Sequence, residues 1–425
     1  MLTSIPTSLL KPGAVLCAPV HDHQLNTKLL ASGVPITEEL LHGLRRRGIH
    51  TVSVEQDDVA RLSLYQPQGT IRIAPPQRAG FRSTYETNLS RELDRTTENA
   101  AELRLKKSSD PFAERILQHE SCPYDAELVV RCGAFHQQSL EFLDGLYCSL
   151  VDAGASRAKP AFERLESTCL QALTQAAEDM DLFLCLGANP YALGYPHRHS
   201  LHVAMVAMGV GAALQLDRRT LVELGIGCLL HDTGMLRLGS EIYLAERILE
   251  PAEFRDIAKH PVLTFELLED SLDRVPVGAR MVAYQMHERC DGSGYPRGRT
   301  SEQIHELAKI AAVADTFVAL VSPRPHRRGV LAYFALEKIL HGVRDGLFDS
   351  RAARGLIESV SLFPIGSYVA TSDNRVGRVV RSGRENFDRP VIELWGRRGL
   401  DKPPSLVDLA YEPDIKIARP LARLR

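Results

Sequence analysis

Six histidine and aspartate side chains between residues 199 and 315 form an ordered pattern that could bind metal ions. They are His199, His231, Asp232, His260, His287 and Asp315. Neutral imidazole and carboxylate together suit iron, manganese or zinc, and no cysteine thiolate belongs to the set. A single histidine in a helix is usually an ordinary surface or core residue, so only the ordered set indicates a metal site. The ordinary interpretation applies to His197, His202, His305 and His326, although His202 lies one helical turn from His199.

The six residues divide into two groups that share one carboxylate. One metal ion could be bound by His199, His231, Asp232 and Asp315. Asp232 has two oxygens and could bridge to a second ion bound by His260 and His287. Two ions roughly 3.5–4 Å apart would activate a water and stabilise the attacking and leaving oxygens of an in-line phosphoryl displacement. The pattern therefore predicts a two-metal hydrolase site in which Asp232 and His231 are catalytic.

A glycine-rich loop follows one of these histidines, because residues 287–296 read HERCDGSGYP. Gly292 and Gly294 permit backbone conformations that are closed to other residues. Tyr295 offers a ring face on which a guanine base could stack. The same loop could be only a tight turn between two helices, because Gly and Pro are turn residues in any case. Its position eight residues beyond a candidate ligand favours the functional interpretation.

Helices must position these residues, and the hydrophobic pattern supplies them. We expect helices at 198–215, 218–232, 251–269, 274–288, 304–322 and 330–344. An earlier helix is indicated by Leu165, Cys169 and Leu173, which recur at i+4 spacing after Pro160. Helices are rigid, so ligands from several of them can converge in the interior of a bundle. The sequence predicts a mainly α fold.

Smaller units flank the helical part. Strands are expected at 14–20 and 49–54 with a helix at 38–47, and later at 367–371, 376–380 and 390–394, where the tail resembles a small β-barrel or sandwich. The expected division is a small α+β domain over 1–75, a linker over 76–124 that is partly helical at 88–105, a helical segment over 125–190 packing on the core, the main helical domain over 191–360, and a small β domain over 361–425.

Composition limits the classes of function. The 425 residues carry a net charge of −2, which argues against a general nucleic-acid or membrane-surface binder. From residue 363 onward the charge is mildly positive, and a solvated face is the favoured interpretation over a docking surface. Eight cysteines without a CxxC pair suit a reducing cytoplasm. We expect no signal peptide and no membrane span, and therefore a cytoplasmic protein.

The segment from about 190 to 345 resembles the HD-GYP domain, a bacterial branch of the HD phosphohydrolase superfamily. The resemblance is carried by LLHDTG at 229–234, His260-Pro261, HERCDGSGYPRG at 287–298 and VAD at 313–315. It implies an HD-type helical bundle that hydrolyses the second messenger cyclic di-GMP to pGpG or GMP, with a metal centre that commonly holds iron or manganese. It also implies that the six residues of the pattern are metal ligands and that Gly294, Tyr295 and Pro296 belong to the signature loop; Arg324 and Arg289 are candidates for contact with substrate phosphate.

Three positions depart from the family pattern. Met235 replaces a lysine that would contact substrate phosphate. Loss of the charged hydrogen bond from that lysine could cost on the order of 1.5–3 kcal/mol of substrate binding. Met286 replaces a histidine before His287, which leaves the second metal with one fewer ligand. Tyr195 replaces a glutamate of the members that hold three metals, so two metals are expected rather than three.

Two other functions therefore stay open. The chain could be a degenerate module that binds cyclic di-GMP or a protein partner with little hydrolysis, or an HD phosphohydrolase of another nucleotide. Amphipathic helices at 125–185 leave room for a homodimer.

Overall fold

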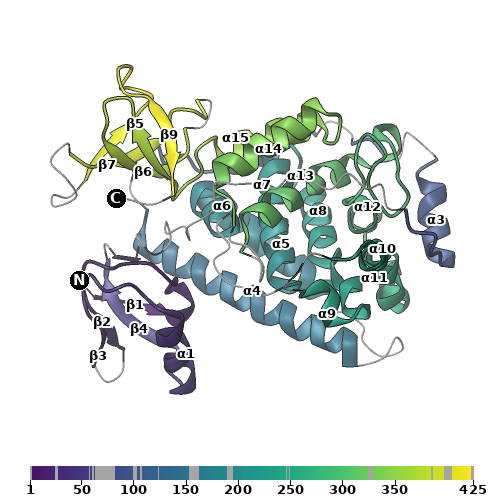
Figure 1. The fold of residues 1–425 in the computed structure, drawn as a ribbon, viewed down its shortest axis with the longest axis horizontal. Coiled ribbons are helices and arrows are strands. Elements are labelled where there is room, and N and C mark those ends of the chain that lie inside the picture. The colour runs from purple at the N-terminus through teal and green to yellow at the C-terminus, as the bar shows by residue number, and fades with distance from the viewer. Residues whose placement is uncertain are drawn as a thin grey trace.

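The computed structural model describes most of the chain. The described residues are 2–23, 27–56, 58–59, 62, 82–98, 103–105, 108–122, 124–152, 162–188, 195–245, 247, 249–323, 329–383, 386–396 and 404–422. Helices fill the centre and right of Figure 1, and two small sheets lie at the left, one near each end of the chain. The predicted mainly α fold is confirmed. Within the described residues, no helix is both long and apolar enough to cross a membrane.

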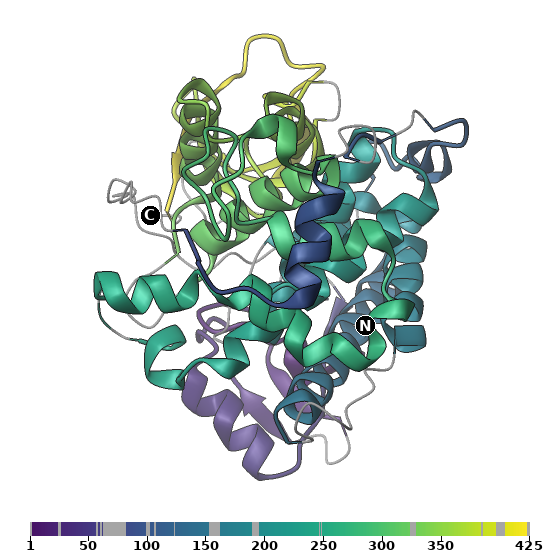
Figure 2. The same cartoon turned by 90° about the vertical axis from the view of Figure 1, so that its right-hand side faces the viewer.

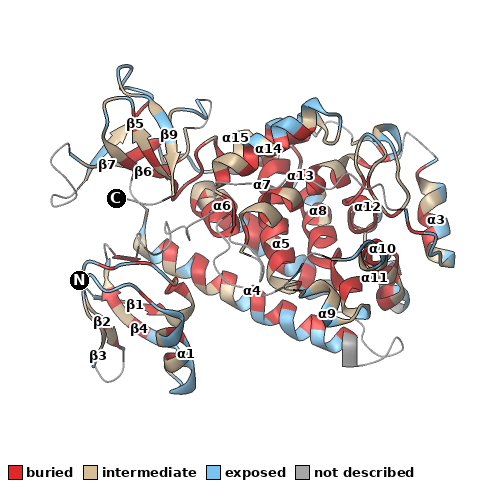
Figure 3. Ribbon diagram, in the orientation of Figure 1, coloured by how far each residue is buried: buried red, intermediate tan, exposed pale blue. Residues whose placement is uncertain are grey.

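The helical part is built from α-helices and short 3₁₀ helices (η). They are α5 (Phe162–Glu178), α6 (Met180–Ala188), α7 (His197–Ala213), α8 (Arg218–Leu230), η3 (Thr233–Arg237), α9 (Ser240–Tyr243), α10 (Pro251–Ile257), α11 (His260–Leu268), η4 (Glu269–Arg274), α12 (Val277–Gln285), η5 (Ser301–Gln303), α13 (Glu306–Val321), α14 (Ala332–Arg344) and α15 (Ser350–Val360). Helix α7 is the centre of this part, since every side chain from His199 to Ala212 is buried (Figure 3). A helix that is apolar on all sides must be surrounded by other elements.

Most expected helices are confirmed, and two differences have physical reasons. The single helix expected at 251–269 is wrong, because the chain forms α10 and α11 with a break at Ala258 and Lys259. Pro261 lacks a backbone N–H and so fits only the first turn of a new helix. Helix α15 was not expected, because Gly355 in its middle is a poor helix former. Asp349 caps this helix by accepting a hydrogen bond from the backbone N of Ala352 at 2.9 Å.

The first sheet contains β1 (Leu2–Pro6), β2 (Val20–Asp22), β3 (Lys28–Leu30) and β4 (Thr51–Glu55) in the antiparallel order β1-β4-β2-β3. The expected helix is confirmed as α1 (Glu38–Arg46), and the Thr37 side chain caps it by accepting from the backbone N of Leu40. The strand expected at 14–20 is wrong. Backbone N–H groups of Cys17 and Ala18 donate to the carboxylate of Asp58 at 3.0 and 2.8 Å, so they do not join a ladder.

Helix α4 (Ala126–Asp152) runs from this sheet along the helical part (Figure 1). Its Tyr147 is buried, and the Tyr147 hydroxyl lies 2.8 Å from the carbonyl oxygen of Leu229 in α8 and 3.0 Å from the hydroxyl of Ser200 in α7. Helix α4 therefore ties α7 to the end of α8. The preceding chain forms α3 (Asn88–Thr96), at the opposite end of the molecule from the first sheet, and η2 (Phe112–Arg115).

The second sheet contains β5 (Tyr368–Thr371), β6 (Val376–Arg381), β7 (Val391–Leu394), β8 (Ser405–Asp408) and β9 (Ile417–Leu421). The three expected strands are confirmed, and β8 and β9 were not expected. In the described part of the tail the strands form one antiparallel sheet in the order β8-β7-β6-β5-β9, which is neither of the two forms expected.

A buried ion pair joins this sheet to the helical part. The guanidinium Nη1 of Arg381 donates to both carboxylate oxygens of Asp179 at 2.8 Å, and the two side chains are 3% and 2% exposed. Asp179 also caps α6, since it accepts from the backbone N of Leu182 at 3.0 Å. The guanidinium of Arg381 stacks on the ring of Tyr124 at 3.8 Å. Removing the arginine would leave the buried Asp179 carboxylate without its two charged hydrogen bonds.

We predict that Arg381→Ala lowers the free energy of unfolding by about 3 kcal/mol, because breaking a buried ion pair by removing one partner costs that much. The matched control is Arg375→Ala, which breaks a partly exposed pair with Asp373 in the turn between β5 and β6. That variant is expected to lose less than about 1 kcal/mol. Urea denaturation of both variants measures the difference, and equal losses would contradict the prediction.

Candidate metal centre

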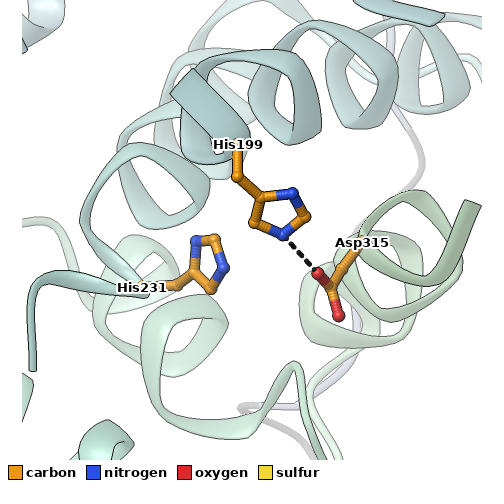
Figure 4. Close-up of side chains that lie close together, drawn as sticks. All are labelled: His199, His231 and Asp315. Carbon is orange, nitrogen blue, oxygen red and sulfur yellow. Dashed lines mark hydrogen bonds and ion pairs between the residues drawn. The ribbon is translucent and has the colours of Figure 1, made fainter. Parts of the chain in front are cut away.

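His199, His231 and Asp315 meet in the interior of the helical part (Figure 4). His199 lies in the first turn of α7, His231 directly follows α8, and Asp315 lies in α13. The ring nitrogen Nε2 of His199 lies 2.9 Å from Oδ1 of Asp315. Ligand atoms of all three residues lie within 4.8 Å of one another, so one ion could contact all three.

Asp232 extends this group toward the other two histidines. Its Oδ2 lies 3.2 Å from Nε2 of His231, and its Oδ1 lies 3.4 Å from Nε2 of His260 and 3.9 Å from Nε2 of His287. His287 also faces Asp315, with 3.6 Å between Nδ1 and Oδ2. The structure thus brings all six residues of the pattern together, and Asp232 lies between the two groups. Their roles as ligands stay a prediction.

Backbone carbonyl groups fix the direction of two of these rings. The nitrogen Nδ1 of His231 lies 2.7 Å from the carbonyl oxygen of Cys228, and Nδ1 of His260 lies 2.8 Å from that of Ile257. A carbonyl only accepts, so each Nδ1 carries the proton and donates. The other nitrogen, Nε2, then presents its lone pair to the centre, which is the arrangement that histidine ligands require.

Thr264 of α11 holds the turn that carries the His-Asp pair. Its hydroxyl donates to the carbonyl oxygen of His231 at 3.0 Å and accepts from the backbone N of Gly234 at 3.0 Å. A Cβ atom on Gly234 would lie 2.1 Å from the carbonyl oxygen of His260, so no other residue fits there. The sequence did not single out Thr264, because nothing in its local spacing links it to a ligand 33 residues earlier.

Four buried polar atoms support the fit of a cation. Nε2 of His231, His260 and His287 and Oδ1 of Asp232 are buried and have no hydrogen-bond partner among the described residues. Buried polar atoms are normally hydrogen-bonded, so a group of four that face one another needs an explanation. Divalent ions bound by imidazole and carboxylate would satisfy all four, and the chemistry of the set suits iron, manganese or zinc.

Burial and neighbouring charges keep three of the candidate ligands in their metal-binding forms near pH 7. Burial lowers the pKa of His260 to about 4 and holds the pKa of His287 well below its usual value, so both rings are neutral near pH 7. Burial alone would raise the pKa of Asp232, but the imidazoles around it hold that pKa well below the usual range. His231 differs, because the nearby carboxylates outweigh its burial and raise its pKa to about 8.

The signature loop, here residues 291–300, packs against the centre. The ring of Tyr295 stacks on His287 with 5.0 Å between ring centroids, and its edge meets the ring of His260 at 5.8 Å. A Cβ atom on Gly294 would lie 2.3 Å from the backbone N of Arg289, so this glycine permits close approach of two backbone segments. Tyr295 therefore braces a candidate ligand with one of its faces.

Glu288, which was not among the predicted site residues, anchors this loop. Its two carboxylate oxygens accept hydrogen bonds from the backbone N of Arg297 at 2.7 Å and of Arg299 at 2.9 Å. Its position directly after a candidate ligand was the only signal in the sequence.

Further aromatic rings surround the centre. Tyr195 lies 5.7 Å from the ring of His199 and 6.0 Å from the ring of Tyr243. Phe254 meets Tyr295 edge-on at 6.3 Å. These side chains are partly exposed and present flat apolar surfaces around the candidate ligands.

The other predicted site residues lie in different surroundings. The guanidinium of Arg289 donates to the carbonyl oxygens of Met286 and Glu288 at 3.3 and 2.8 Å and covers the ring of Phe348, so its assignment to substrate phosphate stays a prediction. Arg324 lies outside the described residues. Met235 is buried in η3, and Met286 belongs to the hydrophobic core. His202 contacts His136, with 3.1 Å between their Nε2 atoms.

Comparison with known proteins agrees with this geometry. The family model of the HD domain matches residues 171–352, which contain the whole candidate centre. This part of the chain is an HD domain. With its signature loop, it belongs to the HD-GYP family, as the sequence predicted.

Curated relatives are similar to parts of the chain. A cyclic di-GMP phosphodiesterase of Pseudomonas aeruginosa is 30% identical over 51% of this chain and 52% of its own length. The cyclic di-GMP phosphodiesterase response regulator RpfG of Xanthomonas campestris pv. campestris is 37% identical over 35% of this chain and 39% of its own. The 3'3'-cGAMP-specific phosphodiesterase 3 of Vibrio cholerae is 30% identical over 41% of this chain and 37% of its own. The chain thus spans about half the length, or less, of these relatives.

We predict that Asp232→Ala abolishes metal binding, because Asp232 is the residue between the two groups of ligands. The metal content of protein purified with Mn(II) or Fe(II) measures this loss. Asp256→Ala is the matched control. Asp256 lies near His260 in the sequence, but its side chain is partly exposed and pairs with Lys259 instead of a candidate ligand. The control is expected to bind metal as the wild type does. Equal metal content in the two variants would contradict the prediction.

The affinity for Mn(II) is expected to depend on pH through His231, whose pKa is raised to about 8. A histidine binds metal only when neutral, so protons compete with the ion below that pH. The apparent affinity should rise about tenfold per pH unit up to about pH 8 and then level off. Competition with a chelator measures it, with the exposed His341→Gln as control. A constant affinity between about pH 6 and 8 would contradict this prediction.

Proposed function

We propose that the protein is a metal-dependent phosphodiesterase that hydrolyses cyclic di-GMP to pGpG or GMP in bacterial signalling. The observation that carries this proposal is the buried convergence of four imidazoles and two carboxylates, with four of their polar atoms facing one another without hydrogen bonds. The similarity to phosphodiesterases of cyclic di-GMP and of 3'3'-cGAMP supports a cyclic dinucleotide as the substrate.

Two divalent ions, iron or manganese, would supply Lewis acidity and lower the pKa of a water at this site. Asp232 is suited to hold both, because its two oxygens face different histidines at 3.2 and 3.4 Å. His199 and Asp315 complete one group, while His260 and His287 complete the other. The ring of Tyr195 lies beside His199, where it supplies no carboxylate, which supports two ions rather than three.

The bases of the substrate would meet the partly exposed aromatic rings around the candidate ligands. One face of Tyr295 already lies on His287, so Tyr243 and Phe254 are the better candidates for stacking on guanine. Stacking of a base on an aromatic side chain is worth about 1–3 kcal/mol. Such contacts would orient the phosphodiester bond over the ligand cluster and exclude water from the bases.

The second candidate function is a binding module with little hydrolysis. Met235 is buried where the family pattern has a lysine, and a thioether can neither donate to phosphate nor carry charge. Met286 lies in the hydrophobic core, so this position does not supply a ligand. Met235 is therefore expected to weaken the binding of substrate phosphate, and Met286 to weaken the binding of the second metal. The six histidine and aspartate residues of the candidate centre are nevertheless all in place.

The test is turnover of cyclic di-GMP by purified protein loaded without oxygen with Mn(II) or Fe(II), with products separated by chromatography. We predict product from the wild type, none from Asp232→Ala, and a slower reaction with 3'3'-cGAMP. Met235→Lys should raise kcat/KM about tenfold, since a charged hydrogen bond to phosphate is worth about 1.5–3 kcal/mol. Tight binding of cyclic di-GMP without product, in protein that holds two metals, would favour the binding module instead.

A further inference from the structure

The segment of residues 82–98 lies against the signature loop, although more than 190 residues separate the two in sequence. Its helix α3 lies at the right-hand end of Figure 1 and crosses the front of the molecule in Figure 2. This segment was expected to be part of a linker. Its described residues instead make specific contacts with the HD domain.

Asp94 of α3 is the centre of these contacts. Its Oδ1 accepts from Nη2 of Arg299 at 2.6 Å and from the hydroxyl of Tyr284 at 3.0 Å. Its Oδ2 accepts from Nε of Arg297 at 3.0 Å. The side chains of Arg297 and Arg299 are only 13% and 12% exposed, so few waters can replace the carboxylate. One acidic side chain thus holds both arginines of the loop.

The backbone of the same segment completes the contact. Nη1 of Arg297 donates to the carbonyl oxygens of Ser83 and Tyr85 at 2.8 and 3.1 Å. In the other direction, the backbone N of Ser83 donates to the carbonyl oxygen of Pro296 at 2.8 Å. Pro296 directly follows Tyr295, whose ring lies on His287. The hydrogen bond between Ser83 and Pro296 is therefore separated from the candidate ligand His287 only by Tyr295.

Two carboxylates hold the signature loop, one from the HD domain and one from the 82–98 segment. Glu288 binds the backbone N–H groups of Arg297 and Arg299, while Asp94 binds their side chains. Glu288 belongs to the HD domain, but Asp94 comes from outside the region that the HD model matches. A loop held only by Glu288 would keep its backbone hydrogen bonds and lose the restraint on its outer face.

We propose that Asp94 is a positioning residue, which fixes the signature loop over the metal centre through Arg297 and Arg299. The proposal rests on the proposed function, because the loop borders the site where the cyclic dinucleotide would bind. Asp94 touches no metal ligand, so it acts on the substrate's fit and not on the metal. Its removal should therefore raise KM much more than it lowers kcat.

The experiment compares Asp94→Ala and Asp94→Asn with Glu92→Ala, an exposed acid on the same helix, in the full chain loaded with Mn(II). Hydrogen exchange of the backbone amides in residues 288–300 is expected to be at least about tenfold faster in Asp94→Ala, because local opening becomes easier. In that variant KM for cyclic di-GMP should rise about tenfold, with kcat within about twofold and metal content unchanged. Asp94→Asn, which keeps the shape of the side chain, should be intermediate, and Glu92→Ala should match the wild type.

Unchanged exchange in Asp94→Ala would overturn the proposal, and so would faster exchange with an unchanged KM. Loss of metal in this variant would also overturn it, because the role would then be general stability. If the wild type neither hydrolyses nor binds cyclic di-GMP, the proposed function fails. Exchange in Asp94→Ala then still decides whether the 82–98 segment holds the loop.

Discussion

The enclosure of two carboxylates among four imidazoles governs how the central helices of this protein meet. Asp232 is 2% exposed, and an ionised carboxylate is costly to bury unless cations or hydrogen bonds surround it. Five segments supply the side chains of the site. They are α7, the end of α8, the start of α11, the chain directly after α12, which carries His287, and α13. These elements must therefore converge at one point, and the apolar surface of α7 gives them a common core.

Backbone atoms largely fix the direction of the candidate ligands. Carbonyl groups orient His231 and His260, Thr264 holds the turn after α8, and Glu288 holds the signature loop. Peptide groups have little freedom once the helices are packed, so rings held by them keep their direction without a bound ligand. The site is thus shaped by the fold before any ion or substrate arrives.

The amino-acid sequence predicted the helical fold and the six-residue cluster because both depend on local signals. Hydrophobic periodicity marked the helices, and His-Asp, His-Pro and Gly-Tyr-Pro marked the site. The missed features depend on distant parts of the chain. Thr264 and Asp94 act on residues about 30 and 200 positions away, and the backbone N–H groups of Cys17 and Ala18 turn to Asp58 instead of a strand. Local propensity contains no information on such pairings.

The buried Tyr147 has a consequence for the size of the working unit. Its hydroxyl joins the carbonyl oxygen of Leu229, two residues before His231, and the hydroxyl of Ser200, the residue after His199. Tyr147 belongs to α4, which precedes residue 171, where the match to the HD domain begins. A fragment cut at the borders of that match would keep all six candidate ligands and lose the brace between two of their helices. The smallest part of this chain able to preserve the geometry of its centre is therefore longer than the domain by which it is recognised.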